Sequence, residues 1–243
     1  MFTTVDDVGV TVVIKGDVDR RRLAHEVRML REFARRGVPV PAVLDYDRHG
    51  SPSVLVQSLA QGRVLSASSA DADWKAAART LRRIHDRIRP RGARFWPQMF
   101  DVAREVVDKD VATEFDAEQR AWMRAAIDEV EQATPGSTVT LHGDAAPYHF
   151  FVTDDRATVI DVADSAIGDP LWDLTVLTLR RPDVLPDVLD AYGADEALRA
   201  HVRRAYRGMV VLRLLAVAGW LIEYGFDSRP VVRELRTLHA EQS

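Results

Sequence analysis

Two aspartates and a histidine near the middle of the chain have the types and spacing of a catalytic centre. Asp144 follows the apolar run 139–141, and His149 comes five residues later. Asp161 ends a second apolar run, 158–160, which is the return strand of a predicted hairpin. Polar residues that end successive strands can meet at one point. A loop carboxylate followed by a carboxylate that holds a metal suits the transfer of a phosphoryl group.

The surrounding motif resembles the aminoglycoside phosphotransferase and choline kinase family. The matching residues are His142, Asp144, Pro147, Asp161 and Asp169, the last of them inside Gly-Asp-Pro. This combination is specific, whereas His-Gly-Asp alone would be weak evidence. The sequence departs from the family pattern at one position, where His149 stands in place of an asparagine.

The resemblance implies an α+β fold of the two-lobed, protein-kinase-like kind. Residues 1–59 would form a small, shortened N-terminal lobe with a hairpin and one helix. Residues 60–243 would form a larger helical lobe that carries the catalytic loop, with the nucleotide between the lobes. The periodicity of the sequence is compatible with this. It predicts a hairpin over 2–15, a strand over 54–59, and helices over 19–36, 71–87, 98–109, 116–133, 171–179, 186–192, 195–224 and 231–241.

Lys15 and Glu26 are candidates for an ion pair. In kinases, a lysine on a strand contacts the nucleotide's phosphates and pairs with a glutamate on the next helix. Lys15 ends a β-branched run, and Glu26 lies beside Val27 on the predicted inward face; Glu32 is a weaker partner. Alternatively, Lys15 faces solvent and Glu26 pairs with Arg22 on the helix surface, which would contribute only about half a kcal/mol.

The resemblance also implies a role for each polar residue. Asp144 would accept or orient the proton of the acceptor hydroxyl, Asp161 would hold a metal on the phosphates, and Lys15 would neutralise phosphate charge. Structural support of the site would come from His142, Asp169 and Asp173. For Asp173, an exposed position in the first turn of a helix is the alternative.

A hinge for the nucleotide base is implied at the end of the strand 54–59. Backbone groups of Gln57, Ser58 and Leu59 would bind the adenine of ATP, or the base of GTP. A plain buried strand followed by a loop would give the same pattern, so the assignment depends on the resemblance.

His149 is the most informative departure from the family. Mg²⁺ prefers oxygen ligands, whereas an imidazole nitrogen suits Mn²⁺ or Zn²⁺ better. Three outcomes are open: one metal held by Asp161 alone, a preference for Mn²⁺ over Mg²⁺, or loss of catalysis. Alternatively, His149 packs in the core beside Phe150. Our hypothesis is that His149 lines the metal site.

The segment before Lys15 is short for the family. Only fourteen residues precede it, enough for one hairpin, and Gly9 alone does not make a phosphate-binding loop. The Gly-rich turn that covers the phosphates would then be shortened or absent, which weakens the case for ordinary ATP binding.

The leading hypothesis is a nucleotide-dependent O-phosphotransferase. It would transfer the γ-phosphate of ATP or GTP to a hydroxyl of a small molecule, such as an aminoglycoside-like antibiotic, or of a peptide serine or threonine. Its setting would be antibiotic resistance or biosynthesis. The alternative is a pseudokinase-like binding or scaffold protein, with a degenerate nucleotide site and a protein partner.

A third hypothesis is a metallohydrolase. Its metal would be held by His142, Asp144, His149 and Asp161. It would leave Lys15 and the Gly-Asp-Pro segment unexplained.

Composition excludes several other classes. The net charge of −4 gives no nucleic-acid footprint, and the absence of cysteine rules out disulfides and thiolate metal sites. The acidic N-terminus lacks the basic region of a signal peptide. The apolar stretch 209–222 contains Arg213 and is short for a membrane span, so we expect a buried helix there. A cytoplasmic location without membrane contact is the default expectation.

Overall fold

The computed structural model describes residues 2–5, 9, 11–90, 96–111, 113–133 and 138–241. By packing, the chain divides into two compact units, each built from two separate stretches of sequence. Unit 1 consists of Met1–Gly92 and Val139–Ala194, and unit 2 consists of Ala93–Thr138 and Asp195–Ser243. Every residue of the predicted site belongs to unit 1. The expected lobe boundary after residue 59 is a different division and stays a prediction.

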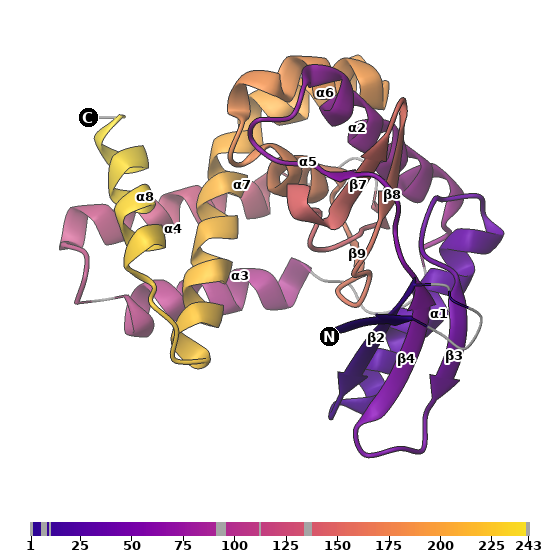
Figure 1. The fold of residues 1–243 in the computed structure, drawn as a ribbon. Helices are drawn as coiled ribbons and strands as arrows, with labels where there is room; N and C mark the ends of the chain where they lie inside the picture. Colours follow the sequence, from indigo (N-terminus) through magenta and orange to yellow (C-terminus); the bar gives the residue numbers. More distant parts are fainter. Residues whose placement is uncertain are drawn as a thin grey trace. The chain divides into compact units, whose positions relative to one another are not determined.

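A four-stranded antiparallel sheet forms one part of unit 1, in the order β1-β2-β4-β3 (Figure 1). The strands are β1 (Phe2–Val5), β2 (Thr11–Asp17), β3 (Val43–Asp47) and β4 (Ser53–Ser58). The predicted hairpin and the strand at 54–59 are confirmed, within a residue or two at their ends. Of the turn expected at 6–9, residues 6–8 lie outside the described residues, so the expected shortening of the Gly-rich turn over the phosphates stays a prediction.

Strand β3 was not expected from the sequence, which predicts a loop there. Asp45 and Asp47 are polar and exposed, and the register slips at a bulge between Val43 and Asp45. The segment is a strand because it pairs with β4. Its own sequence lacks the alternation of apolar and polar residues from which a strand could be predicted.

Helix α1 (Arg20–Arg35) has the start and end that its sequence indicates. The Asp19 side chain accepts hydrogen bonds from the first turn, as an N-cap does, and Gly37 follows the helix at φ +72°. Leu23, Val27, Leu30 and Phe33 recur at helical spacing and form a buried stripe. The helix therefore presents one fixed face to its own unit.

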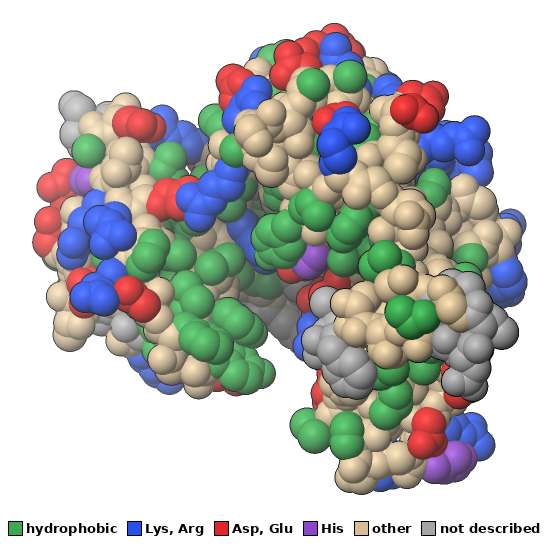
Figure 2. Space-filling model, in the orientation of Figure 1, with side chains coloured by type: hydrophobic (Ala, Val, Ile, Leu, Met, Phe, Trp, Pro, Cys, Tyr) green, Lys and Arg blue, Asp and Glu red, His purple; other side chains and the backbone are tan. Residues whose placement is uncertain are grey.

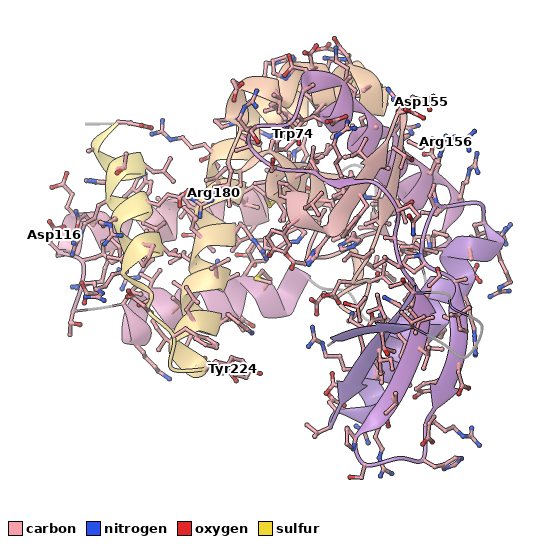
Figure 3. The ribbon with its side chains drawn as sticks, viewed as in Figure 1. Trp74, Asp116, Asp155, Arg156, Arg180 and Tyr224 are labelled. Carbon is pink, nitrogen blue, oxygen red and sulfur yellow. The ribbon has the colours of Figure 1, made fainter. Side chains whose placement is uncertain are left out.

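The second part of unit 1 surrounds a hairpin. Its strands β7 (Phe150–Thr153) and β8 (Arg156–Val159) pair antiparallel, and β5 (Arg63–Val64) adds to β7. Asp155 and Arg156 lie at the tip of this hairpin (Figure 3). A second small pair, β6 (Val139–Thr140) with β9 (Ile167–Gly168), flanks the predicted catalytic loop. The helices of this part are α2 (Asp71–Arg87), α5 (Pro170–Thr178) and α6 (Leu185–Tyr192).

Unit 2 is helical. Its helices are α3 (Trp96–Glu105), continued by a π-helical turn (Val106–Asp110), α4 (Ala117–Gln132), α7 (Glu196–Glu223) and α8 (Arg229–Ala240). Gly208 lets α7 approach α4 closely, because a Cβ there would lie 2.9 Å from the carbonyl oxygen of Ala126. All eight helices expected from the sequence are observed. The turn expected at 135–136 lies outside the described residues.

Within the described part of the chain, α7 alone is long and apolar enough to cross a membrane by length and composition. It is longer than the apolar stretch 209–222, since polar turns precede that stretch. Half of its most apolar window is buried, and the core helix of a soluble protein satisfies the same criteria. The predicted burial of residues such as Met209 and Leu212 is confirmed.

An aromatic cluster is exposed at the C-terminal end of α7. Trp220, Tyr224 and Phe226 are each more than half exposed, and the ring of Trp220 stacks on that of Phe226. Figure 3 shows Tyr224 at this helix end, and Figure 2 shows hydrophobic side chains gathered there.

Candidate active site

Lys15 links two carboxylates in unit 1. Its Nζ lies 2.5 Å from Glu26 Oε1 and 3.0 Å from Asp161 Oδ1. Burial alone would lower the pKa of Lys15, but the two carboxylates outweigh it and raise that pKa above its ordinary value. Lys15 is therefore a cation at neutral pH, held where α1 and the end of the β7–β8 hairpin meet.

The position of Glu26 follows from the helix period. It is three residues after Leu23 and four before Leu30, so it shares their buried face and is only 3% exposed. Burial raises the pKa of Glu26, and Lys15 offsets part of that rise. The pairing with Lys15 is observed, while Glu32 instead pairs with Arg35 and Arg36.

Asp161 stands directly beyond β8, as the sequence predicts, in an unusual backbone conformation. Its φ of +58° is in the left-handed region that non-glycine residues rarely adopt. Burial would raise the pKa of Asp161, but the ammonium group of Lys15 lowers it below its ordinary value. Its side chain remains 36% exposed. Asp161 is thus an ionised carboxylate that a ligand can reach.

The loop of His142 and Gly143 is held by Asp173. The Asp173 carboxylate is completely buried and accepts hydrogen bonds from the backbone N–H groups of His142 (2.7 Å) and Gly143 (3.0 Å). Gly143 has φ +92°, and a Cβ there would lie 1.9 Å from the carbonyl oxygen of Asp164. Only glycine fits this turn.

His85 completes the environment of Asp173. Its Nε2–H donates to Asp173 Oδ2 at 3.0 Å, while its Nδ1 accepts from the Tyr192 hydroxyl at 2.7 Å. The three side chains are buried in unit 1. His85 is thus a packed, hydrogen-bonded residue of α2. The exposed alternative for Asp173 is wrong, because that side chain has no exposed surface.

His142 braces the loop in the expected manner. Its Nε2–H donates to the carbonyl oxygen of Ile160 at 2.9 Å, and its Nδ1 accepts from the N–H of Asp144 at 3.2 Å. The residue is completely buried. These bonds tie the loop of Asp144 to the residue preceding Asp161.

His149 lies between the two predicted catalytic aspartates. Its Nδ1–H donates to the carbonyl oxygen of Asp144 at 2.8 Å, and its Nε2 is 3.8 Å from Asp161 Oδ2. Burial lowers the pKa of His149, so the ring is neutral and Nε2 carries a lone pair. Two acceptor atoms from different segments therefore face each other. The alternative of a purely core-packed His149 is incomplete, because the ring also reaches the carboxylates.

Asp169 and Trp172 fix the segment that follows Asp161. The side chain of Asp169 is buried and caps α5 by accepting a hydrogen bond from Leu171 N–H at 2.9 Å. Trp172 Nε1–H donates to the carbonyl oxygen of Gly143 at 2.7 Å. We assigned no role to Trp172 from sequence; its place beside Asp173 in the motif was the available signal.

The three predicted hinge residues differ in how well they are placed to bind a nucleotide base. Gln57 is buried within β4, and Ser58 uses both its N–H and its hydroxyl oxygen in hydrogen bonds with the backbone of Ala42. Leu59 is the first residue after the strand. The binding of a base by these residues stays a prediction, with Leu59 as its best-placed member.

The metallohydrolase hypothesis receives no support. Among the described residues, no group of three or more His, Asp and Glu side chains is arranged to hold a metal ion. A two-ligand site at Asp161 and His149 is compatible with the geometry, because Mg²⁺ in nucleotide sites is commonly held by one or two protein groups and by the phosphates.

The fold is that of known kinases of small molecules. The structure is similar to aminoglycoside phosphotransferase APH(3'')-Id from Streptomyces rimosus in complex with ADP and streptomycin, with a TM-score of 0.63, 23% identity and coverage of 88% of this chain and 92% of that one. It is also similar to the GDP complex of aminoglycoside 2'-phosphotransferase-IIIa, with a TM-score of 0.75 and 18% identity; the match covers 95% of this chain and 85% of that one. A choline/ethanolamine kinase family protein from Mesorhizobium loti matches with a TM-score of 0.74 and 21% identity, over 95% of this chain and 81% of that one. The expected α+β, two-lobed kinase-like fold is confirmed.

The model of the phosphotransferase enzyme family matches residues 7–209, which is most of the chain. The chain therefore belongs to this family and is a phosphotransferase. The resemblance stated from the sequence is confirmed. A comparison with curated proteins gives no match.

Proposed function

We propose that the protein transfers the γ-phosphoryl group of ATP or GTP to a hydroxyl of a small molecule. The observation that carries the proposal is the meeting of Lys15, Glu26 and Asp161, with Asp144 joined to them through His149. Phosphoryl transfer needs mainly positioned charges, and this cluster supplies one partly buried cation and two reachable carboxylates.

Each residue of the cluster has a task in this proposal. Lys15 binds the phosphates, and Glu26 keeps its ammonium group in place when Asp161 turns to other partners. Asp144, whose side chain is 21% exposed, orients the acceptor hydroxyl and takes its proton. His142 and Asp173 keep the backbone of this loop fixed.

Asp161 and His149 would hold a divalent cation on the phosphates. When bound, such a cation neutralises charge that develops on the transferred group. The imidazole favours Mn²⁺ at this position more than the asparagine of relatives would, because nitrogen is a softer ligand than an amide oxygen.

The acceptor is proposed to be a small molecule with an alcohol group. The similar structures include complexes with ADP and streptomycin and with GDP, and a choline/ethanolamine kinase family protein. An aminoglycoside, an amino alcohol and a peptide serine are the acceptors to test, in that order.

Nucleotide binding is the first test. Thermal shift should be measured with ATP and with GTP, each with Mg²⁺, with Mn²⁺ and without metal. We expect a metal-dependent shift that Lys15→Ala and Asp161→Ala both abolish. Matched controls are Lys75→Ala, which removes a half-exposed lysine paired with Asp187, and Asp155→Ala at the hairpin tip.

The same preparations then report turnover. Release of ADP or GDP is followed with streptomycin, kanamycin, choline and a serine peptide as acceptors. A shift equal in wild type and Lys15→Ala, or no shift under any condition, would overturn the assignment of the nucleotide site. Binding without turnover of any acceptor would instead favour a scaffold.

A further inference from the structure

A cavity lies in unit 1, beside α1 and on residues that the proposed reaction does not use. Its volume is about 370 Å³, within the usual range for small-molecule sites. Its walls come from α1, from the residues after α2, from β6, and from the segment that follows Asp161. The cavity is therefore built from elements that are distant in sequence.

The charged side chains at this cavity are mostly basic. Arg28, Arg35 and Arg89 line it, together with one carboxylate, Glu32. Glu32 is paired with Arg35 and with Arg36, so its charge is already balanced. Arg89 forms no ion pair with any residue that the structure describes. A net positive potential results.

Arg28 is bound to a neutral partner. Its Nη2 donates to His25 Nδ1 at 2.7 Å, and His25 Nε2–H donates to the carbonyl oxygen of Ser165 at 2.9 Å. A guanidinium has five N–H donors, so Arg28 keeps donors for an anion while it holds His25. Because a histidine accepts this bond, the charge of Arg28 is not neutralised there.

Thr140 supplies an independent observation. It lines the cavity, is 5% exposed, and its Oγ1 has no hydrogen-bond partner among the described residues. Leaving a buried hydroxyl unpaired is unfavourable, and such groups in native proteins usually have a partner. The apolar remainder of the wall, which includes Met29 and Ile88, suits a carbon skeleton.

We propose that this cavity binds a small organic anion, a phosphate monoester or carboxylate with an apolar body. Arg28 and Arg89 receive the anionic group, and Met29 and Ile88 contact the apolar part. The hydroxyl oxygen of Thr140 is enclosed in this structure and rotates to donate to the anion. The site is separate from the cluster of Lys15 and Asp161.

Occupancy of this cavity should affect the proposed active site. His25 precedes Glu26 on α1, and Ser165 follows Asp161 by four residues, so a ligand here touches both segments that meet at Lys15. A bound anion would stabilise α1 against the segment 162–166 and thereby the ion pair of Lys15 with Glu26. This second step rests on the proposed function, whereas the binding itself does not.

Binding is tested by calorimetry with phenyl phosphate and with phenylacetate; inorganic phosphate and benzyl alcohol serve as the anionic and the apolar comparison. We expect at least one organic anion to bind wild type more tightly than either comparison compound. Arg89→Ala and Thr140→Val should each weaken that binding about tenfold or more, because each removes a donor to a charged group.

Two further variants decide where the probe binds. Arg31→Ala changes an exposed arginine of α1 that does not line the cavity and should leave binding unchanged. Lys15→Ala should keep most of the affinity and change it only by the factor through which the ligand and the ion pair are coupled, whereas phenyl phosphate that occupied the nucleotide site would lose its binding in that variant. Thr140→Val should keep or raise the unfolding temperature without ligand, because it removes an unpaired buried hydroxyl.

The outcomes separate the two proposals. Failure of both organic anions to bind, equal binding by Thr140→Val and wild type, or loss of binding in Lys15→Ala would overturn the cavity site. If binding behaves as expected but does not change the affinity for nucleotide, only the coupling to the active site fails. If wild type binds no nucleotide, that result counts against the proposed function and not against the cavity site.

Discussion

Asp173 and Asp161 are two carboxylates of unit 1 with opposite environments. Asp173 is completely buried and accepts from three donors, the N–H groups of His142 and Gly143 and the ring of His85. Asp161 is about one-third exposed, is bound by Lys15, and faces the lone pair of His149. The first carboxylate is satisfied within the protein, and the second keeps an oxygen available for a ligand.

This difference indicates that Asp173 holds the loop in position and that Asp161 contacts the reacting groups. A buried carboxylate that is fully hydrogen-bonded stabilises the fold and has no reason to be reached by substrate. A carboxylate beside another acceptor atom has an unfavourable neighbour until a cation or proton lies between them. Substitution of the first should therefore change stability, and substitution around the second should change activity.

The largest expected effect is on turnover. Asp144→Asn should lower kcat by about a thousandfold, within the usual range for removing a general base, and should leave the unfolding temperature nearly unchanged. The kcat of phosphoryl transfer to the best acceptor is measured for this variant and for the control Asp155→Asn, which alters an aspartate at the hairpin tip. An Asp144→Asn enzyme with more than a tenth of wild-type kcat would show that Asp144 is not the base.

Next in size is a loss of stability. Asp173→Ala leaves three buried donors without their acceptor and should lower the free energy of unfolding by about 3 kcal/mol or more. Urea unfolding gives this value. Asp187→Ala is the control, since it removes an exposed carboxylate paired with Lys75 and should cost less than about 1 kcal/mol. Similar costs for both variants would refute the positioning role of Asp173.

A smaller effect concerns the choice of metal. His149→Asn should shift the preference from Mn²⁺ toward Mg²⁺ by about tenfold, because an amide oxygen replaces an imidazole nitrogen. The ratio is read from metal titrations of the nucleotide-dependent thermal shift and, separately, from bound Mn²⁺ in paramagnetic resonance spectra. An unchanged ratio would mean that His149 contacts no metal.

The smallest effect is a difference in pH dependence. Burial lowers the pKa of His25 below 6.5, with Arg28 adding to that direction. Since the unfolded chain then takes up the proton first, wild type should lose stability as pH falls below about 6.5, until the folded pKa is reached. His25→Gln should lack this part of the loss. Unfolding temperatures from pH 5 to 8 test it, and parallel curves for the two proteins would argue against a neutral His25.

The sequence predicted the elements with strong local signals. Helix α1 has a cap at Asp19, an apolar stripe and a closing Gly37, and the hairpin before Asp161 has its turn at 154–155. The pairing of Lys15 with Glu26 followed from the family motif, whereas the contact of Lys15 with Asp161 was not predicted.

Other features could not be read in advance, since they depend on contacts between distant segments. Strand β3 owes its existence to β4, and the three donors to Asp173 come from two separate stretches of chain. The link from His25 to Ser165 spans 140 residues. No local sequence pattern indicates that His25 and Ser165 are partners, so the cavity could not be predicted from the sequence.

The interleaving of the two units has a consequence for synthesis of the protein. The chain begins unit 1, leaves it after Gly92 for unit 2, returns at Val139, and leaves again after Ala194. A nascent chain that ends at Thr138 contains neither unit in full: it has Lys15 and Glu26 but not Asp161. Until residues beyond 161 emerge from the ribosome, Lys15 lacks its second carboxylate partner, Asp161. Co-translational folding of this protein should therefore be late and sensitive to chaperones that shield its incomplete first segment.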